Sequence, residues 1–353
     1  MAYTTIDNPH KFFNTVLYTG NGTTDHAITG VGFQPDWTWL KKRNNADDHI
    51  LSDAVRGATK YVISNSTAVE GTYAEGFKSF DSDGFTLGNA NNTNQNTHTF
   101  AAWNWRAGNS SGSSNGDGSI TSTVSVNTTA GFSIVSYTGT GSAATVGHGL
   151  GAVPKMFIVK NRDSTESWRV YHNALGATKE IYLDLSNAAG TSSSSFNDTE
   201  PTSSVFSVGT GNGTNKSGEN LIAYCFTEIQ GYSKFGSYTG QGGAGGQYPF
   251  IYTGFKPAWV MTKRTDSTSG WIIRDNKRDT FNPSETSLYA NANTADDTSG
   301  GASYYLDFLS NGFKFRGSGT AFNASGGTYI YLAFAENPFV ANDSGTAVPV
   351  VAR

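Results

Sequence analysis

Two pairs of charged residues recur at one spacing in this sequence. Asp53 and Arg56 stand in "HILSDAVRG", and Asp275 and Arg278 stand in "WIIRDNKRD", each time 18 and 21 residues after a proline. A carboxylate and a guanidinium three residues apart can form a buried ion pair or bind a sugar hydroxyl or a carboxylate. The middle of the chain has a histidine and a leucine at these offsets. We therefore interpret the pairs first as structural, and second as candidate ligand or interface residues.

Aromatic side chains are the second candidate set. Tryptophan and tyrosine, with asparagine in nearby loops, are residue types that stack on sugar rings and hydrogen-bond to hydroxyl groups. The tryptophans considered for a ligand or an interface are Trp103, Trp105, Trp168 and Trp271. They stand at positions where a β-sandwich needs core residues in any case, so the core interpretation comes first.

No motif for catalysis or metal binding stands out. The six histidines form no H-x-x-x-H or H-E-x-x-H pattern, and the chain has neither a G-x-S-x-G elbow nor a P-loop. Cys225, the single cysteine, lies in an apolar stretch that reads as a strand. Turn chemistry explains the acidic pairs Asp81/Asp83 and Asp296/Asp297 without a calcium ion. We expect a protein that is not an enzyme, with no catalytic residues, no metal and no cofactor.

The composition favours a turn-rich β protein. Of 353 residues 42 are glycine, 13% are aromatic and only 15% are charged, against about a quarter in average domains. The net charge of −4 argues against a nucleic-acid partner. No stretch approaches the ~18 apolar residues of a membrane helix, and the first residues do not resemble a secretory signal. We expect a soluble protein made in the cytoplasm, with no membrane partner.

One sequence unit occurs three times along the chain. Each copy has a "YTG", a proline 17 to 19 residues after its tyrosine, and a lysine six residues after that proline. The proline and lysine of the copies are Pro35 and Lys41, Pro154 and Lys160, and Pro257 and Lys263. Apolar residues occupy both faces of the strand between them, which indicates a central strand covered on each side. We interpret the proline as the start of this strand and the lysine as the point where it leaves the core.

These patterns predict an all-β protein of three tandem antiparallel β-sandwich repeats, concanavalin-like or jelly-roll-like. The expected segments are an N-terminal arm over 1–12, repeats over 13–107, 131–230 and 231–339, a linker over 108–130, and a C-terminal tail over 340–353. Because the linker is rich in glycine, serine and threonine, we expect it to be flexible. The second and third repeats are joined almost directly, so we expect the first repeat to be the freer one.

The sequence resembles a repeat domain found in virion proteins of marine bacteriophages and cyanophages. The resemblance rests on "FFNTVLYTGNGTTDHAITGVGFQPDWTWLKKR", "DAVRGATKYVISNST", "GFKSFDSDGFTLG" and "FAAWNWRAG", with the start "MAYTTIDNPHKFF" and the endings "AFAENPFV" and "VPVVAR". It implies a structural component of the particle, a tail fibre or a capsid decoration, located in the virion. Its partners would be other virion proteins and, in a second role, glycans of the host surface.

Oligomeric state and function leave alternatives. Virion appendages are usually symmetric oligomers, so we expect a homo-oligomer and favour a trimer. Three units in one chain would instead imitate a trimer at a threefold position of a capsid. The alternative function is a lectin-like module for cell-surface glycans. A polysaccharide-degrading enzyme would need two carboxylates about 5–10 Å apart across a groove, and no repeated acidic pair occupies strand positions. We therefore predict a non-enzymatic virion structural protein.

Overall fold

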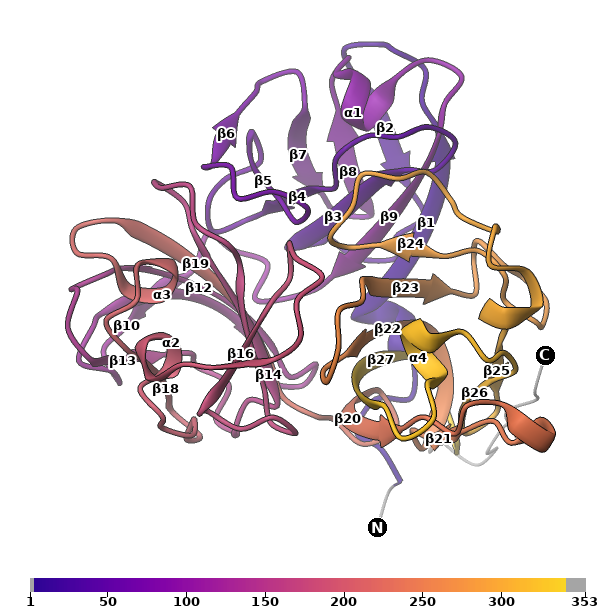
Figure 1. Ribbon diagram of the computed structural model, residues 1–353. Helices are drawn as coiled ribbons and strands as arrows, with labels where there is room; N and C mark the ends of the chain where they lie inside the picture. Colours follow the sequence, from indigo (N-terminus) through magenta and orange to yellow (C-terminus); the bar gives the residue numbers. More distant parts are fainter. Residues whose placement is uncertain (1–2, 341–353) are drawn as a thin grey trace.

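The computed structural model describes residues 3–340, which form an all-β chain of three lobes (Figure 1). Each lobe has one larger and one smaller antiparallel sheet. Helices in the described part are three or four residues long, and none there has the length and apolar character needed to cross a membrane. Residues 1–2 of the expected arm and residues 341–353 of the expected tail, with "VPVVAR", lie outside the described part.

The first lobe follows the short turn η1 (Pro9–Lys11). Its larger sheet has the order β1 (Phe13–Thr19), β9 (Thr99–Trp105), β3 (Trp37–Lys42), β4 (Ile50–Asp53), β5 (Lys60–Ile63) and β6 (Gly71–Thr72). The smaller sheet has the order β2 (His26–Thr29), β8 (Gly84–Leu87) and β7 (Phe77–Asp81), and α1 (Asn91–Asn94) precedes β9. An apolar cluster that includes Leu40, Phe85 and Ala102 packs between the two sheets.

The second lobe has an eight-stranded sheet. Its order is β10 (Ser113–Asn115), β11 (Ser122–Asn127), β12 (Phe132–Thr138), β19 (Asn220–Phe226), β14 (Met156–Asn161), β15 (Arg169–His172), β16 (Lys179–Tyr182) and β17 (Gly190–Thr191). The smaller sheet pairs β13 (Ala144–Gly147) with β18 (Val205–Val208), and the short helices are α2 (Ser193–Phe196) and α3 (Asn212–Asn215). Phe157, Phe206 and Ala223 are part of the cluster between the sheets.

The third lobe repeats this plan with five strands and three. The larger sheet has the order β20 (Ser233–Thr239), β27 (Thr328–Pro338), β22 (Phe255–Arg264), β23 (Trp271–Asp275) and β24 (Leu288–Tyr289). The smaller sheet has the order β21 (Phe250–Tyr252), β26 (Gly312–Phe315) and β25 (Leu306–Leu309). The short helices are η2 (Ala244–Gly246), η3 (Gly301–Tyr304) and α4 (Thr320–Asn323). Val260, Phe313 and Tyr331 pack between its sheets.

The segment 108–130, expected to be a flexible linker, is instead part of a sheet. Its β11 pairs along its whole length with β12, and β10 pairs with β11 at the sheet edge. Val124 and Ile120 pack into the apolar cluster of the second lobe. The alternation in "STVSVN" buries side chains on one face, and this outweighs the glycine and serine residues that precede it.

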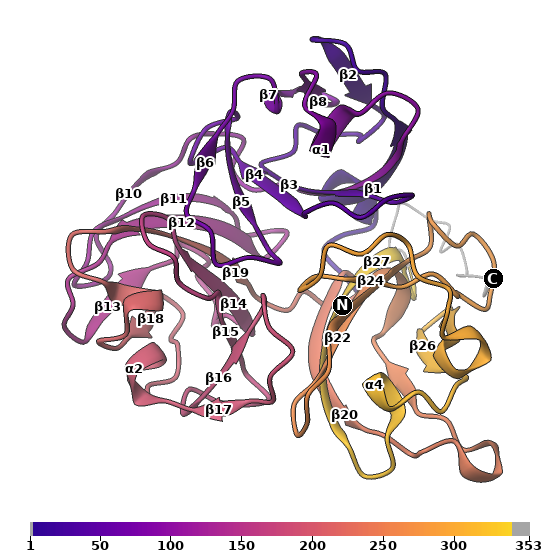
Figure 2. The ribbon, with the colours of Figure 1, turned by 45° about the horizontal axis from the view of Figure 1, so that its top comes forward.

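The larger sheets of the three lobes meet in one central core (Figure 2). Trp37 stacks on Tyr224 of the second lobe with ring centroids 4.3 Å apart. Trp105 meets Trp259 of the third lobe edge to face at 5.8 Å, and Phe226 lies 5.9 Å from Phe334. The first lobe is therefore packed against the other two, and the expectation that it is the freer one was wrong.

The N-terminal arm also belongs to this core. Ile6 is buried in it, and Phe12 meets Tyr232 edge to face with ring centroids 6.1 Å apart. The hydroxyl of Thr4 donates to the carbonyl of Gln230 at 2.6 Å. The arm thus ties the start of the chain to the junction between the second and third lobes.

The strand beside each proline has the same neighbours in all three lobes. The proline precedes this strand in the first two lobes, whereas Pro257 lies within β22 at a register shift, so the prediction that it starts the strand was wrong in the third lobe. In β3 and β9 Trp37 lies opposite Trp105, in β14 and β19 Met156 lies opposite Phe226, and in β22 and β27 Trp259 lies opposite Phe334. These side chains enter the central core, whereas the alternate residues face the smaller sheet. The prediction of a strand covered on both faces is confirmed.

The "YTG" motif holds the turn before the last strand of each lobe. The tyrosine hydroxyls of Tyr18, Tyr137 and Tyr238 donate to the carbonyls of Thr93, Thr214 and Phe322 at 2.6, 2.6 and 2.9 Å. An asparagine that the sequence analysis did not single out fixes the same turn. The amides of Asn94, Asn215 and Asn323 donate to the carbonyls of Gly88, Gly209 and Gly317 at 2.8, 2.7 and 2.9 Å.

Replacing the glycine of a "YTG" by alanine is expected to destabilise the protein. A methyl group on Gly139 would overlap the carbonyl oxygen of Lys216, and a backbone atom cannot move aside as a flexible side chain can. We expect Gly139→Ala to lower the free energy of unfolding by about 1–3 kcal/mol in urea denaturation. Gly190→Ala is the control, because nothing lies within 4 Å of a Cβ there. Equal stability of the two variants would contradict this account of the motif.

Candidate functional site

The candidate ligand or interface residues lie buried where the lobes meet. Their exposed fractions are 0 to 9% for Asp53, Arg56, Trp103, Trp105, Trp168, Trp271, Asp275 and Arg278. All seven tryptophans of the chain belong to the fully buried side chains. None of these residues presents a face to solvent on which a sugar could stack. The site that they form is a set of three junctions inside the molecule.

The junction between the first and second lobes is built on Asp53 and Arg56. Arg56 Nε bonds to the Asp53 carboxylate, and Arg56 Nη2 donates to the carbonyl of Leu51 at 2.9 Å. Tyr224 of the second lobe donates its hydroxyl to Asp53 Oδ2 at 2.8 Å and accepts from Arg56 Nη2 at 3.2 Å. Burial lowers the pKa of Arg56, but Asp53 and Tyr224 raise it more, so the guanidinium stays charged.

The junction between the third and first lobes repeats this arrangement. Arg278 Nε donates to Asp275 Oδ2 at 2.6 Å, and its Nη2 donates to the carbonyl of Ile273 at 3.0 Å. The neighbouring lobe supplies the indole N–H of Trp103, which donates to Asp275 Oδ2 at 3.1 Å. In both junctions an ion pair of one lobe therefore meets a hydrogen-bond donor on the last strand of another.

The junction between the second and third lobes explains the exception in the repeat. His172 and Leu175 replace the ion pair, and His172 Nε2 contacts the backbone oxygen of Tyr331 at 3.2 Å. Burial lowers the pKa of His172 to about 4, so the ring is neutral. Trp103 and Tyr224 occupy equivalent positions on the last strands of the first and second lobes. Leu332 occupies this position in the third lobe. An ion pair facing leucine would lack its third partner, which favours a neutral side chain.

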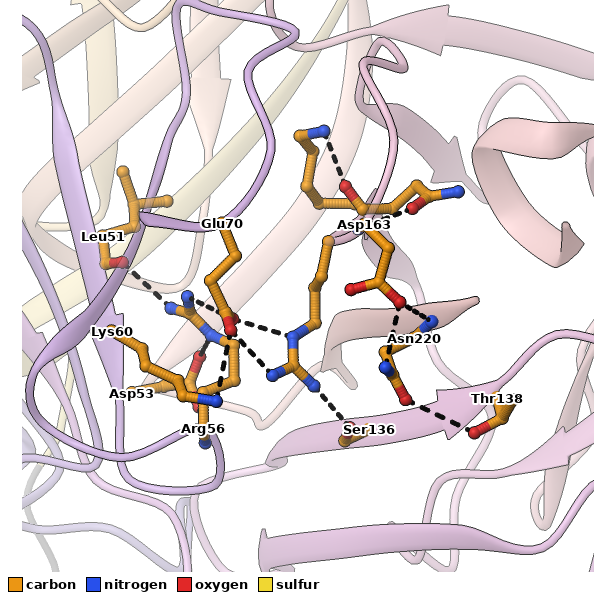
Figure 3. A network of polar contacts seen from close by, with 12 residues as sticks. Leu51, Asp53, Arg56, Lys60, Glu70, Ser136, Thr138, Asp163 and Asn220 are labelled. Carbon is orange, nitrogen blue, oxygen red and sulfur yellow. Dashed lines mark hydrogen bonds and ion pairs between the residues drawn. The ribbon is translucent and has the colours of Figure 1, made fainter. Parts of the chain in front are cut away.

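A second polar layer surrounds the first of these junctions (Figure 3). Arg162 of the second lobe holds both carboxylate oxygens of Glu70, with Nε to Oε2 at 2.7 Å and Nη2 to Oε1 at 2.9 Å. Arg56 and Lys60 each approach Glu70 at 3.4 Å. Burial raises the pKa of Glu70, but the bond from Arg162 and the charge of Arg56 lower it more, and the net shift is downward. Glu70 is therefore a shared anion for both lobes.

Backbone contacts between the lobes recur in cyclic order. The amides of Glu70, Ala189 and Asp296 donate to the carbonyls of Arg162, Thr265 and Arg43 at 2.8, 2.9 and 2.7 Å. These contacts join the first lobe to the second, the second to the third, and the third to the first. Trp168 and Trp271 follow the same cycle, since their indole N–H groups donate to the carbonyls of Ile63 and Tyr182 at 2.8 and 2.7 Å.

The repeated lysine is the junction residue whose role sequence reasoning missed. Lys41, Lys160 and Lys263 are all fully buried, so the interpretation of the lysine as the point where the strand leaves the core was wrong. Each ammonium donates to at least one carbonyl of its own lobe and to one carbonyl of another lobe. Lys263 donates to the carbonyl of Ser186 in the second lobe at 3.1 Å, and Lys160 donates to the carbonyl of Thr67 in the first lobe at 3.2 Å. Lys41 donates to the carbonyl of Asn293 in the third lobe at 3.2 Å. The sequence signal for this role was that the lysine stands six residues after the proline in all three copies.

These lysines predict a rise of stability with pH. Burial lowers the pKa of Lys41, Lys160 and Lys263 to about 8, from an ordinary value of 10.5. Between these values the unfolded chain binds more protons than the folded chain, so the free energy of unfolding increases with pH. Below pH 8 the lysines are charged in both states. We expect a gain of roughly 2–4 kcal/mol between about pH 7.5 and 9 in urea denaturation.

Variants at one lysine test this assignment. Lys160→Met is expected to lose about a third of the rise, whatever its absolute stability, because one of three equivalent groups is gone. Above pH 9 Cys225 opposes the rise, since burial raises the pKa of its thiol above the ordinary 9.0. A stability that is flat or falling between pH 7.5 and 9 would contradict the shared role of the lysines.

The acidic pairs considered for calcium are engaged by protein groups. Asp83 accepts from the amides of Gly30 and Gly32 at 3.0 and 2.7 Å, and Asp81 accepts from Ser79 and Thr86 at 2.8 and 2.7 Å. Asp296 pairs with Arg43 and Arg278, and Asp297 accepts from Tyr289 at 2.9 Å. Within residues 3–340 no group of three His, Cys, Asp or Glu side chains is placed to hold a metal ion.

The fold and the junctions define an all-β protein whose antiparallel sheets pack around one aromatic core. The chain belongs to the family described as a domain of unknown function (DUF7483), whose sequence profile matches residues 8–338. The match covers all three lobes. No curated protein and no solved structure matches the chain.

Proposed function

We propose that the chain is three copies of one β-sandwich unit arranged as a covalently linked pseudo-trimer, and that it serves as a non-enzymatic structural protein of a phage particle. The observation that supports this best is the cyclic order of the junctions. The backbone contacts and the buried lysines run from lobe to lobe and return to the first. Closed rings of contacts of this kind are the usual form of homo-oligomeric interfaces.

The pseudo-trimer replaces the homotrimer that we favoured from the sequence. The inner faces of the three larger sheets are already covered by one another within a single chain. A further trimer could not use these faces, so we propose that one chain takes the place of three subunits. Such a chain suits a threefold position of a capsid or the head of a trimeric fibre, where its partners are other virion proteins.

The virion assignment itself rests on the sequence resemblance, and the architecture supports it in one respect. A particle protein without disulfide bonds needs a large core, and the shared core with its seven buried tryptophans provides one. The lectin-like alternative loses its original basis, because the four tryptophans named for it are buried. Host glycans remain a second partner of this proposal, at other residues than these.

Two measurements test the proposal. Light scattering of the purified chain is expected to give the mass of one chain, 37.5 kDa, and a mass of three chains would contradict the pseudo-trimer. Mass spectrometry of purified particles of the phage that encodes the chain should find it in the mature virion. Its absence from mature particles would refute the virion assignment and leave the pseudo-trimer untouched.

A further inference from the structure

A hollow of about 360 Å³ lies on the outside of the first lobe. It is lined by Asp47, Tyr73, Asn89, Ala90, Asn91 and Asn92. The asparagines precede and begin α1, and Tyr73 follows β6 at the start of a turn. This volume is at the small end of ligand pockets, which span about 300–1,000 Å³, and it suits one or two sugar rings. No lysine or arginine is among the lining residues.

Four of the polar side chains of this hollow make no hydrogen bond to the described part of the protein. In the part of the chain that the structure describes, no hydrogen bond reaches the side-chain amides of Asn89, Asn91 and Asn92 or the hydroxyl of Tyr73. Nearby, by contrast, the Asn94 side chain bonds to several groups, among them Gly88. Tyr73 is 48% exposed. Three free amides and a free aromatic ring therefore surround one hollow.

The acidic residue of the hollow is held in place. The Asp47 carboxylate bonds to Lys42, whose ammonium also donates to Gln95 Oε1 at 2.8 Å. The Asp47 amide donates to the carbonyl of Asn293 in the third lobe at 2.8 Å, and its Oδ1 accepts from the amide of Asp48 at 2.9 Å. A fixed carboxylate is an acceptor for hydroxyl groups, and its charge is balanced by Lys42 without a cation facing the ligand.

The same place differs in the other two lobes. The amide of Ala90 donates to the carbonyl of Glu75 at 2.9 Å. The equivalent bonds run from the amide of Gly211 to the carbonyl of Ser194 at 2.8 Å in the second lobe, and from the amide of Gly319 to the carbonyl of Ser303 at 2.9 Å in the third. Those acceptors belong to the helices α2 and η3, whereas Glu75 belongs to a non-helical turn. The positions of the three asparagines are Thr210, Asn212 and Gly213 in the second lobe, and Ser318, Thr320 and Ala321 in the third. The full set of amides beside an exposed tyrosine is confined to the first lobe.

We propose that this hollow binds a neutral saccharide. The exposed ring of Tyr73 would lie against the apolar face of a sugar, while Asn89, Asn91 and Asn92 donate to and accept from its hydroxyl groups. Asp47 accepts from a further hydroxyl and disfavours sugars that carry a carboxylate, because no cation lines the hollow. The inference goes beyond the structural role proposed above and holds whether or not the chain is part of a virion.

Saturation-transfer NMR on the full chain tests this site. The probes are maltose, cellobiose, lactose and mannobiose at millimolar concentration, with 3′-sialyllactose as the acidic comparison. We expect transfer to at least one neutral saccharide, at least a tenfold weaker binding in Tyr73→Ala and in Asn91→Ala, and unchanged binding in Tyr252→Ala. Tyr252 is the matched control, since it is an exposed tyrosine of the third lobe, 55% accessible and outside this hollow.

Three results would overturn the proposal. These are no transfer to any neutral saccharide, transfer to 3′-sialyllactose alone, and binding that survives in both pocket variants. Because Tyr73 and Asn91 are exposed, both variants are expected to unfold in the same urea range as the parent chain, so a loss of binding reports on the hollow. None of these results bears on the mass of the chain or on its presence in particles.

Discussion

Asp53→Ala is expected to lower the free energy of unfolding by about 3–5 kcal/mol, because it leaves the Arg56 guanidinium buried without its anion. Both side chains are fully buried, and the carboxylate also accepts the hydroxyl of Tyr224 from the second lobe. One substitution thus breaks an ion pair and a contact between lobes. Urea denaturation at neutral pH, followed by tryptophan fluorescence, measures the loss.

The third junction of the protein supplies the control for this prediction. A triple variant, Asp53→His, Arg56→Leu and Tyr224→Leu, copies the residues His172, Leu175 and Leu332 into the first junction. It removes the charges together with their partner, so we expect it to be more stable than Asp53→Ala. If Asp53→Ala were neutral, or if the triple variant were the less stable of the two, the pair would not act as a charged link between lobes.

Trp37→Ala is expected to cost about 3–5 kcal/mol and to weaken all three lobes together. The Trp37 ring packs on Trp105 of its own lobe at 4.4 Å and on Tyr224 of the second lobe at 4.3 Å. The cavity would open in the core that the lobes share rather than between the sheets of one lobe. Differential scanning calorimetry should show one transition at a lower temperature, with no separate melting of the first lobe.

A matched substitution separates the shared core from a lobe's own core. Phe85→Ala removes a fully buried ring from the cluster between the two sheets of the first lobe. It is expected to cost a similar free energy, but local opening of the first lobe should precede global unfolding in hydrogen exchange. Two resolved calorimetric transitions in Trp37→Ala would contradict a single core for the three lobes.

The sequence by itself determined the β architecture and the places where its units repeat. Trp37 and Leu40 alternate across one strand with apolar neighbours on both faces, a pattern that only a doubly covered strand satisfies. The recurrent proline, "YTG" and lysine marked equivalent positions because each meets a local backbone need within its lobe. The virion role and its partners stay predictions, since the repeats carry no chemistry that specifies them.

Only the tertiary structure decided what covers the face of that strand that is turned away from the smaller sheet. A run of apolar residues predicts that a face is buried, but it does not specify whether a sheet, another lobe or another chain covers that face. For the same reason the sequence left a ligand site open as the second interpretation of Asp53 and Arg56, until Tyr224, 168 residues from Arg56, was found to bond to them. The linker prediction failed because composition describes the average residue, whereas a few apolar residues such as Ile120 and Val124 are enough to anchor the segment in a core. The hollow beside Tyr73 had no sequence signal, since its lining comes from three segments that only the fold brings together.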